Sequence, residues 1–101
     1  MLSEFEKFFV GKRAEQESGG VHIEFKRRSL PTPAMNVILE TNSRGASISA
    51  WESGAVDIDV LDYDTGQCLF ANRYDFQTAQ EMLSVLEDAY HRIINNSFTP
   101  S

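Results

Sequence analysis

Four aspartates are the side chains of this sequence whose type and spacing most suggest chemistry. They are Asp57, Asp59, Asp62 and Asp64. Alternate carboxylates can ligate Ca²⁺, but the helix-flanked calcium loop requires Gly at its sixth position and Glu at its twelfth. Counted from Asp57, those positions hold Asp62 and Cys68. We therefore predict no metal site and no cofactor in this segment.

Nucleophiles and general bases are sparse. His22 and His91 lie far apart in the sequence, and neither belongs to a nucleophile motif. Cys68 stands among apolar residues of an expected strand, which predicts a packed and unreactive thiol. The glycines at 45, 54 and 66 stand singly in turns, unlike the glycine-rich loops that hold phosphates. The sequence therefore predicts a protein that is not an enzyme.

Residues 46–61 predict a β-hairpin with two different faces. Apolar and polar residues alternate at 46–51 and again at 56–61, on either side of a turn at 52–54. Such alternation is typical of strands that are buried on one face only. By this parity Trp51 shares the open face with Ser49, Asp57 and Asp59. An exposed Trp among short polar and acidic residues is typical of protein interfaces; the alternative is an indole folded over the sheet edge or under a loop.

The open face is too small to form a stable interface by itself. A tight partner typically covers about 800 Å² per side, whereas four strands of roughly six residues present about 400 Å² in projection. The loop 62–66 should contribute, because Tyr63 between two aspartates can hold an Arg or Lys side chain. The residues that we predict to bind a partner are Ser49, Trp51, Glu52, Asp57, Asp59, Asp62, Tyr63 and Asp64.

Two helices and three more strands must position this hairpin. Leu2 and the phenylalanines at 5, 8 and 9 predict an amphipathic helix over 2–17. A capping box of Thr78 and Glu81 predicts the start of a second helix, which runs to about residue 95. Strands are expected at 21–26, 35–41, 46–51, 56–61 and 67–74, with a turn at 42–45.

These elements predict an α+β fold. Short connections favour pairing between consecutive strands, so we expect an N-terminal helix, a five-stranded antiparallel meander and a C-terminal helix, with both helices on one face. Residues 1–101 should form a single domain with a frayed tail at 96–101. Ile38 falls on the outward parity of its strand, so that strand is covered on both sides or its outer face is partly apolar.

Charge and cysteine content limit the class of partner. The net charge is −6, and no basic residue lies between Arg44 and Arg73. Such a surface repels nucleic acid and anionic membranes and favours a cationic protein partner, although acidic residues also serve solubility alone. The basic triplet at 26–28 is interpreted as a solvated strand end. With one cysteine, no apolar stretch of membrane-spanning length and no signal-peptide pattern, we expect a cytoplasmic protein.

The turn Trp51-Glu-Ser-Gly54, the acidic stretch Val56-Asp-Ile-Asp-Val-Leu-Asp-Tyr-Asp-Thr-Gly66 and the amphipathic segment from Thr78 resemble the TriTu family of immunity proteins. Members of that family are encoded beside Rhs-type toxins delivered by type VI secretion. The toxin domain is an ADP-ribosyltransferase that modifies elongation factor Tu. The resemblance brings no catalytic residues. It implies an immunity protein that occludes the NAD-binding cleft of its toxin.

The resemblance further implies a monomer that forms a one-to-one heterodimer with its toxin. An alternative is a secretion chaperone, which is also small, acidic and α/β, and which holds an effector segment. Because such chaperones usually dimerise through an exposed apolar surface, a stable dimer would favour the chaperone.

Overall fold

The structure, a computed structural model, describes residues 1–16, 19–29 and 32–95. The predicted tail at 96–101 lies outside the described residues. The elements follow in the order α1 (Leu2–Glu15), β1 (His22–Arg28), β2 (Ala34–Glu40), β3 (Arg44–Trp51), β4 (Ala55–Asp62), β5 (Cys68–Asp75) and α2 (Ala79–Asn95). The predicted elements are all present, with bounds displaced by at most two residues.

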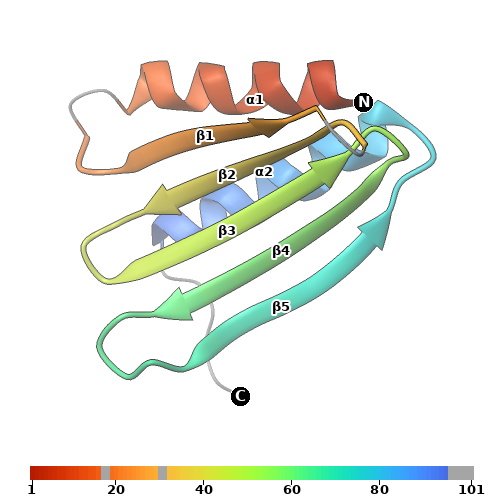
Figure 1. Cartoon of the computed structure of the whole chain (residues 1–101). Coiled ribbons are helices and arrows are strands. Elements are labelled where there is room, and N and C mark those ends of the chain that lie inside the picture. The colour runs from red at the N-terminus through yellow and green to blue at the C-terminus, as the bar shows by residue number, and fades with distance from the viewer. Residues whose placement is uncertain (17–18, 30–31, 96–101) are drawn as a thin grey trace.

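The five strands form one antiparallel sheet in the order β1-β2-β3-β4-β5. Both helices lie on the same side of it, with α1 along β1 and α2 behind the middle of the sheet (Figure 1). This arrangement confirms the predicted α+β meander. The sheet therefore has a covered face, towards the helices, and an open face.

The covered face carries the apolar residues of the alternating pattern. Three rows of side chains cross the strands β2, β3 and β4: Leu39–Ala46–Val60, Val37–Ile48–Ile58 and Met35–Ala50–Val56. All of these side chains are buried. The rows meet aromatic residues of α1, where Phe5 and Phe9 are completely buried and Phe8 is half-buried. Removal of this apolar surface from water is the main source of the fold's stability.

Helix α2 is fixed at both ends by polar contacts. At its N-terminus, the backbone N–H of Glu81 donates to Thr78 Oγ1 at 3.2 Å, as the capping-box pattern predicts. At its C-terminus, Arg44 donates to the carbonyl oxygens of Ile93 at 2.7 Å and Ile94 at 3.2 Å. The sequence placed Arg44 in a turn, and this was wrong. Arg44 begins β3 and is buried, because it supplies donors to carbonyls that end the helix.

An irregularity between β4 and β5 corrects the prediction for Cys68. Leu61 pairs with Cys68 and Val60 pairs with Phe70, so Leu69 is an extra residue in β5. Such a bulge interrupts the alternation of side chains, so Cys68 and Phe70 point to opposite faces of the sheet. Cys68 is therefore exposed rather than packed, while Phe70 lies on the covered face, half-buried.

Candidate protein-binding surface

The open face consists of four rows of side chains that cross the sheet. The strand pairing aligns His22–Glu40–Gly45–Leu61–Cys68, then Glu24–Ile38–Ser47–Asp59–Ala71, then Lys26–Asn36–Ser49–Asp57–Arg73, and last Arg28–Ala34–Trp51. Most of these side chains are polar, and none of them is among the buried residues. Four of the eight predicted partner-binding residues lie on this face: Ser49, Trp51, Asp57 and Asp59. Asp62 instead pairs with Arg44, whose side chain lies on the covered side.

Trp51 lies on the open face and is half-buried there. Its neighbour across β2 is Ala34, which leaves room for the indole. The guanidinium of Arg73 sits over the indole, 5.4 Å from the ring centroid. The same guanidinium pairs with Asp57, Nη1 to Oδ2 at 3.5 Å. The tryptophan is therefore on the predicted face, but its nearest charged neighbour is a cation, and one of the predicted aspartates is already paired.

The turn after Trp51 has a fixed shape. The backbone N–H of Gly54 donates to the Trp51 carbonyl at 3.0 Å, and Phe76 N–H donates to the Gly54 carbonyl at 2.9 Å. Gly54 has φ of +103°, and a Cβ at this position would overlap the carbonyl oxygen of Phe76. Only glycine meets both conditions without strain. Glu52 is exposed at the tip of this turn, where its carboxylate accepts a hydrogen bond from the Met1 amino group.

The remaining aspartates divide into structural and solvent-facing groups. Asp62 accepts from the Asp64 backbone N–H at 3.2 Å and from the Thr65 hydroxyl at 2.9 Å, so its carboxylate holds the β4–β5 turn. Asp59 and Asp64 are exposed. Neither makes an ion pair with any residue in the described part of the chain. These two carboxylates are available to a partner.

Tyr63 folds back from the turn over the open face. Its backbone N–H donates to the Ser43 carbonyl at 2.9 Å, and its ring lies against Gly45, where a Cβ would overlap the ring and hydroxyl. Partial burial, together with the charge and hydrogen bond of Glu40, raises the pKa of the Tyr63 phenol. Tyr63 nevertheless remains 46% exposed. It forms one wall of a shallow apolar pocket.

The pocket has a volume of about 360 Å³. Apolar and small groups line most of it, chiefly Ile38, Gly45, Leu61, Tyr63 and Cys68. Leu61 is 43% exposed, a high value for a residue of its size. The outer face is thus partly apolar, which settles the alternative left open for Ile38. The sequence signal for this pocket was weak: Ile38 and Leu61 are apolar residues at outward positions, and only the strand pairing brings them together.

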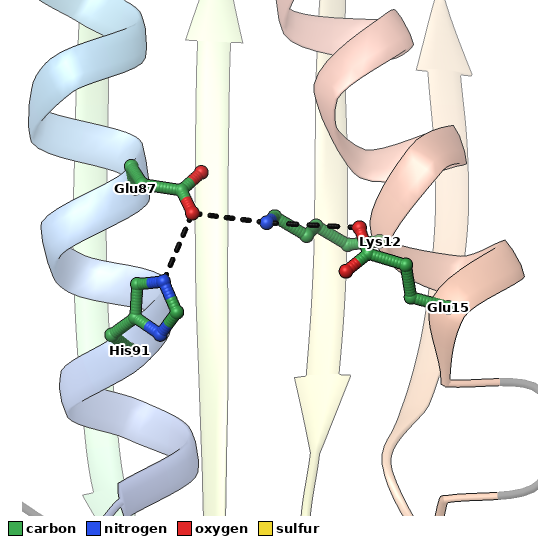
Figure 2. Close-up of polar contacts among 4 residues, drawn as sticks. All are labelled: Lys12, Glu15, Glu87 and His91. Atoms are coloured by element: carbon green, nitrogen blue, oxygen red, sulfur yellow. Dashed lines mark hydrogen bonds and ion pairs between the residues drawn. The ribbon is translucent and has the colours of Figure 1, made fainter.

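A second polar cluster lies on the helical side of the molecule (Figure 2). Glu87 of α2 accepts from Lys12 of α1 at 3.0 Å and contacts His91 Nε2 at 2.9 Å. The pKa of Glu87 is lowered overall, because the hydrogen bond from Lys12 outweighs the opposite effect of partial burial. Burial lowers the pKa of Lys12, but the hydrogen bond and charge of Glu87 raise it overall. The contact between Lys12 and Glu87 joins the two helices. His91 is an exposed residue that contacts Glu87 within α2.

No arrangement suited to a metal ion is found among the described residues, where no three His, Cys, Asp or Glu side chains converge. The other histidine, His22, contacts Glu24 at 3.0 Å on the outer surface of β1. Neither α1 nor α2, as far as the described residues extend, is long and apolar enough to cross a membrane.

The fold defines a small α+β domain in which two helices cover one face of the sheet and leave the other face uncovered. Residues 3–92 match the model of a protein family described as immunity protein TriTu. This chain belongs to that family. Immunity proteins neutralise a toxin by acting on it, so membership implies a protein partner. A comparison with curated proteins gave no match.

Proposed function

We propose that this protein binds an ADP-ribosyltransferase toxin domain and blocks its NAD-binding cleft with the open face of the sheet. Family membership supports the immunity role. The observation that carries the choice of surface is the uncovered face itself. Both helices lie behind the sheet, while Trp51, Leu61 and Tyr63 stay partly exposed in front of it.

Chemical complementarity supports occlusion of a nucleotide site. A cleft that holds the phosphates of a dinucleotide presents cations or backbone N–H groups. The exposed carboxylates of Asp59 and Asp64 can take the place of those phosphates, and an aromatic side chain can enter the adjoining apolar slot. The proposed contact set is that predicted from the sequence, with Ser49 and Glu52 at its margins. Asp57 and Asp62 contribute mainly by holding Arg73 and the turn.

The proposed complex contains one immunity protein and one toxin domain in the cytoplasm, and the immunity protein performs no catalysis. Its net charge of −6 favours rapid encounter with a cationic toxin surface. The elongation factor is protected because the toxin can no longer bind NAD.

The experiment uses the purified toxin domain encoded beside this protein. We expect an equimolar amount of the protein to abolish transfer of labelled ADP-ribose to elongation factor Tu, and to prevent NAD from binding the toxin. If the two proteins associate but NAD still binds, occlusion of the NAD cleft is wrong. If they do not associate, the immunity role for this toxin is wrong. A stable dimer of the protein alone, measured by light scattering, would instead favour the secretion-chaperone alternative.

A further inference from the structure

The charges on the open face are separated into two halves. The acidic half consists of the two rows that contain Glu24, Glu40 and Asp59, next to Asp64 in the β4–β5 turn. Those two rows contain no Lys or Arg. The basic half consists of the other two rows, where Lys26, Arg28 and Arg73 outnumber one carboxylate, Asp57, which pairs with Arg73. The sequence did not show this division, since it depends on which strands are neighbours.

The apolar pocket lies over the two rows of the acidic half, beside the β4–β5 turn. Ile38 and Leu61 supply apolar surface from the neighbouring strands β2 and β4, and Tyr63 closes one side. Asp59 stands at the rim and is exposed. The pocket is also preformed, because Gly45 admits the ring of Tyr63 and Ser43 fixes its backbone. A preformed pocket loses little conformational entropy when it is filled.

We infer that this pocket is the primary docking point for the toxin, and that it receives an apolar side chain of the toxin flanked by Lys or Arg. The inference rests on the proposed function, because it takes the toxin as the partner. The apolar part of the ligand fills the space between Ile38, Leu61 and Tyr63. The flanking cation pairs with Asp59. The separation of charge on the open face then fixes how the protein is oriented on the toxin. The acidic half meets the cationic part of the toxin, and the basic half meets a part that is not cationic.

The Trp51 end is a weaker docking point. Arg73 already lies over the indole and pairs with Asp57, so a partner must displace this arginine to reach the ring face. Its positive charge also repels a cationic ligand. Asp59, by contrast, has no ion pair within the described residues to break. The acidic half therefore offers apolar contact and unpaired negative charge at the same place.

A second copy of this chain is a poorer occupant than the toxin. The halves of opposite charge could align across a two-fold axis. However, each copy carries a net charge of −6, so two copies repel one another as they approach. A cationic toxin surface meets no such repulsion.

The test uses two matched pairs of variants and the purified toxin domain, with dissociation constants measured by a surface biosensor. Asp59→Lys in the acidic half is matched by Asp88→Lys on α2, which makes the same change of charge on the helical side. Leu61→Ala in the pocket is matched by Val10→Ala on α1, since the two residues are 43% and 44% exposed. We expect Asp59→Lys and Leu61→Ala to weaken binding by about tenfold or more, and the two controls to change it by less than about threefold.

Gly45→Ala provides an independent variant, because the added Cβ overlaps Tyr63 and must move the ring. It should weaken binding with both Asp59 and Leu61 intact. Melting temperatures of all variants show whether each is folded. If the parent protein binds the toxin and the pocket variants bind equally well, the pocket inference is wrong while the proposed function stands. If the parent does not bind, the proposed function is wrong. If the parent dimerises and Leu61→Ala abolishes the dimer, a second copy occupies the pocket and the inference is also wrong.

Discussion

The two faces of the sheet are built from alternate residues of the same strands, yet their side chains serve different ends. On β4, Ile58 is 1% exposed against the helices, whereas the next residue, Asp59, is exposed on the open face. Burial of the covered face offsets the conformational entropy that the chain loses on folding. The open face keeps half-exposed apolar groups and unpaired carboxylates that add little to folding. Because the two sets of side chains are separate, we expect substitutions on the open face to change partner binding without changing stability.

The largest effect should come from the covered face. Ile58→Ala removes a buried side chain from the central row of the sheet and leaves a cavity, so it should lower the free energy of unfolding by about 2–5 kcal/mol. Asp59→Ala, one residue further, should change it by less than about 0.5 kcal/mol. Urea unfolding of both variants gives the comparison. Similar losses for the two would show that the open face is also a folding element.

A smaller loss is expected where the covered face meets the end of α2. Arg44→Met removes the donors to the Ile93 and Ile94 carbonyls while it keeps the aliphatic stem, so unfolding free energy should fall by about 1–3 kcal/mol. Arg73→Met on the open face is the control, with an expected loss below about 1 kcal/mol. A loss for Arg44→Met below about 1 kcal/mol would contradict the assignment of Arg44 as the residue that caps α2.

The smallest effect is a pH dependence on the helical side. Because the pKa of Glu87 is lowered in the folded protein, its ion pair with Lys12 stabilises the fold above the ordinary carboxyl value of 4.5 and is lost as pH falls through the lowered value. Glu87→Gln should therefore be less stable than the parent by under about 1 kcal/mol at neutral pH. The gap should close in acid.

Unfolding of both proteins in urea, at about pH 7 and about pH 3, measures this gap. Asp88→Asn is the matched control, because Asp88 pairs with Arg92 of the same helix and does not join the two helices. A gap for Glu87→Gln that stays constant over this range would show that the side chain acts through packing rather than charge.

The meander and its covered face could be predicted from the sequence because they follow from local alternation. Residues such as Val37 and Ile48 repeat with period two, and short turns make neighbouring strands pair. The face assigned to Trp51 followed from the same parity. The contact between Trp51 and Arg73 could not be predicted, because the register of β4 with β5 brings this arginine to the indole.

The pocket was beyond prediction for related reasons. Cys68 is exposed because a bulge at Leu69 reverses the alternation of side chains at the start of β5. No local sequence pattern predicts this extra residue. Tyr63 leaves its turn and returns over Gly45, which requires a glycine on a strand that is distant in sequence. The available signals were the outward apolar residues Ile38 and Leu61. Single apolar residues on a surface are common, so these acquire meaning only when the strands bring them together.

The most direct test of the account is a side-chain footprint of the protein bound to its toxin. Hydroxyl-radical labelling of the free and bound protein, followed by mass spectrometry, reports which exposed side chains become covered. The account predicts that Leu61, Tyr63 and Trp51 lose reactivity on binding, while Val10 and His91 on the helical side keep theirs. Protection of Val10 and His91 with Leu61 and Tyr63 unchanged would contradict it, because the toxin would then dock on the helices.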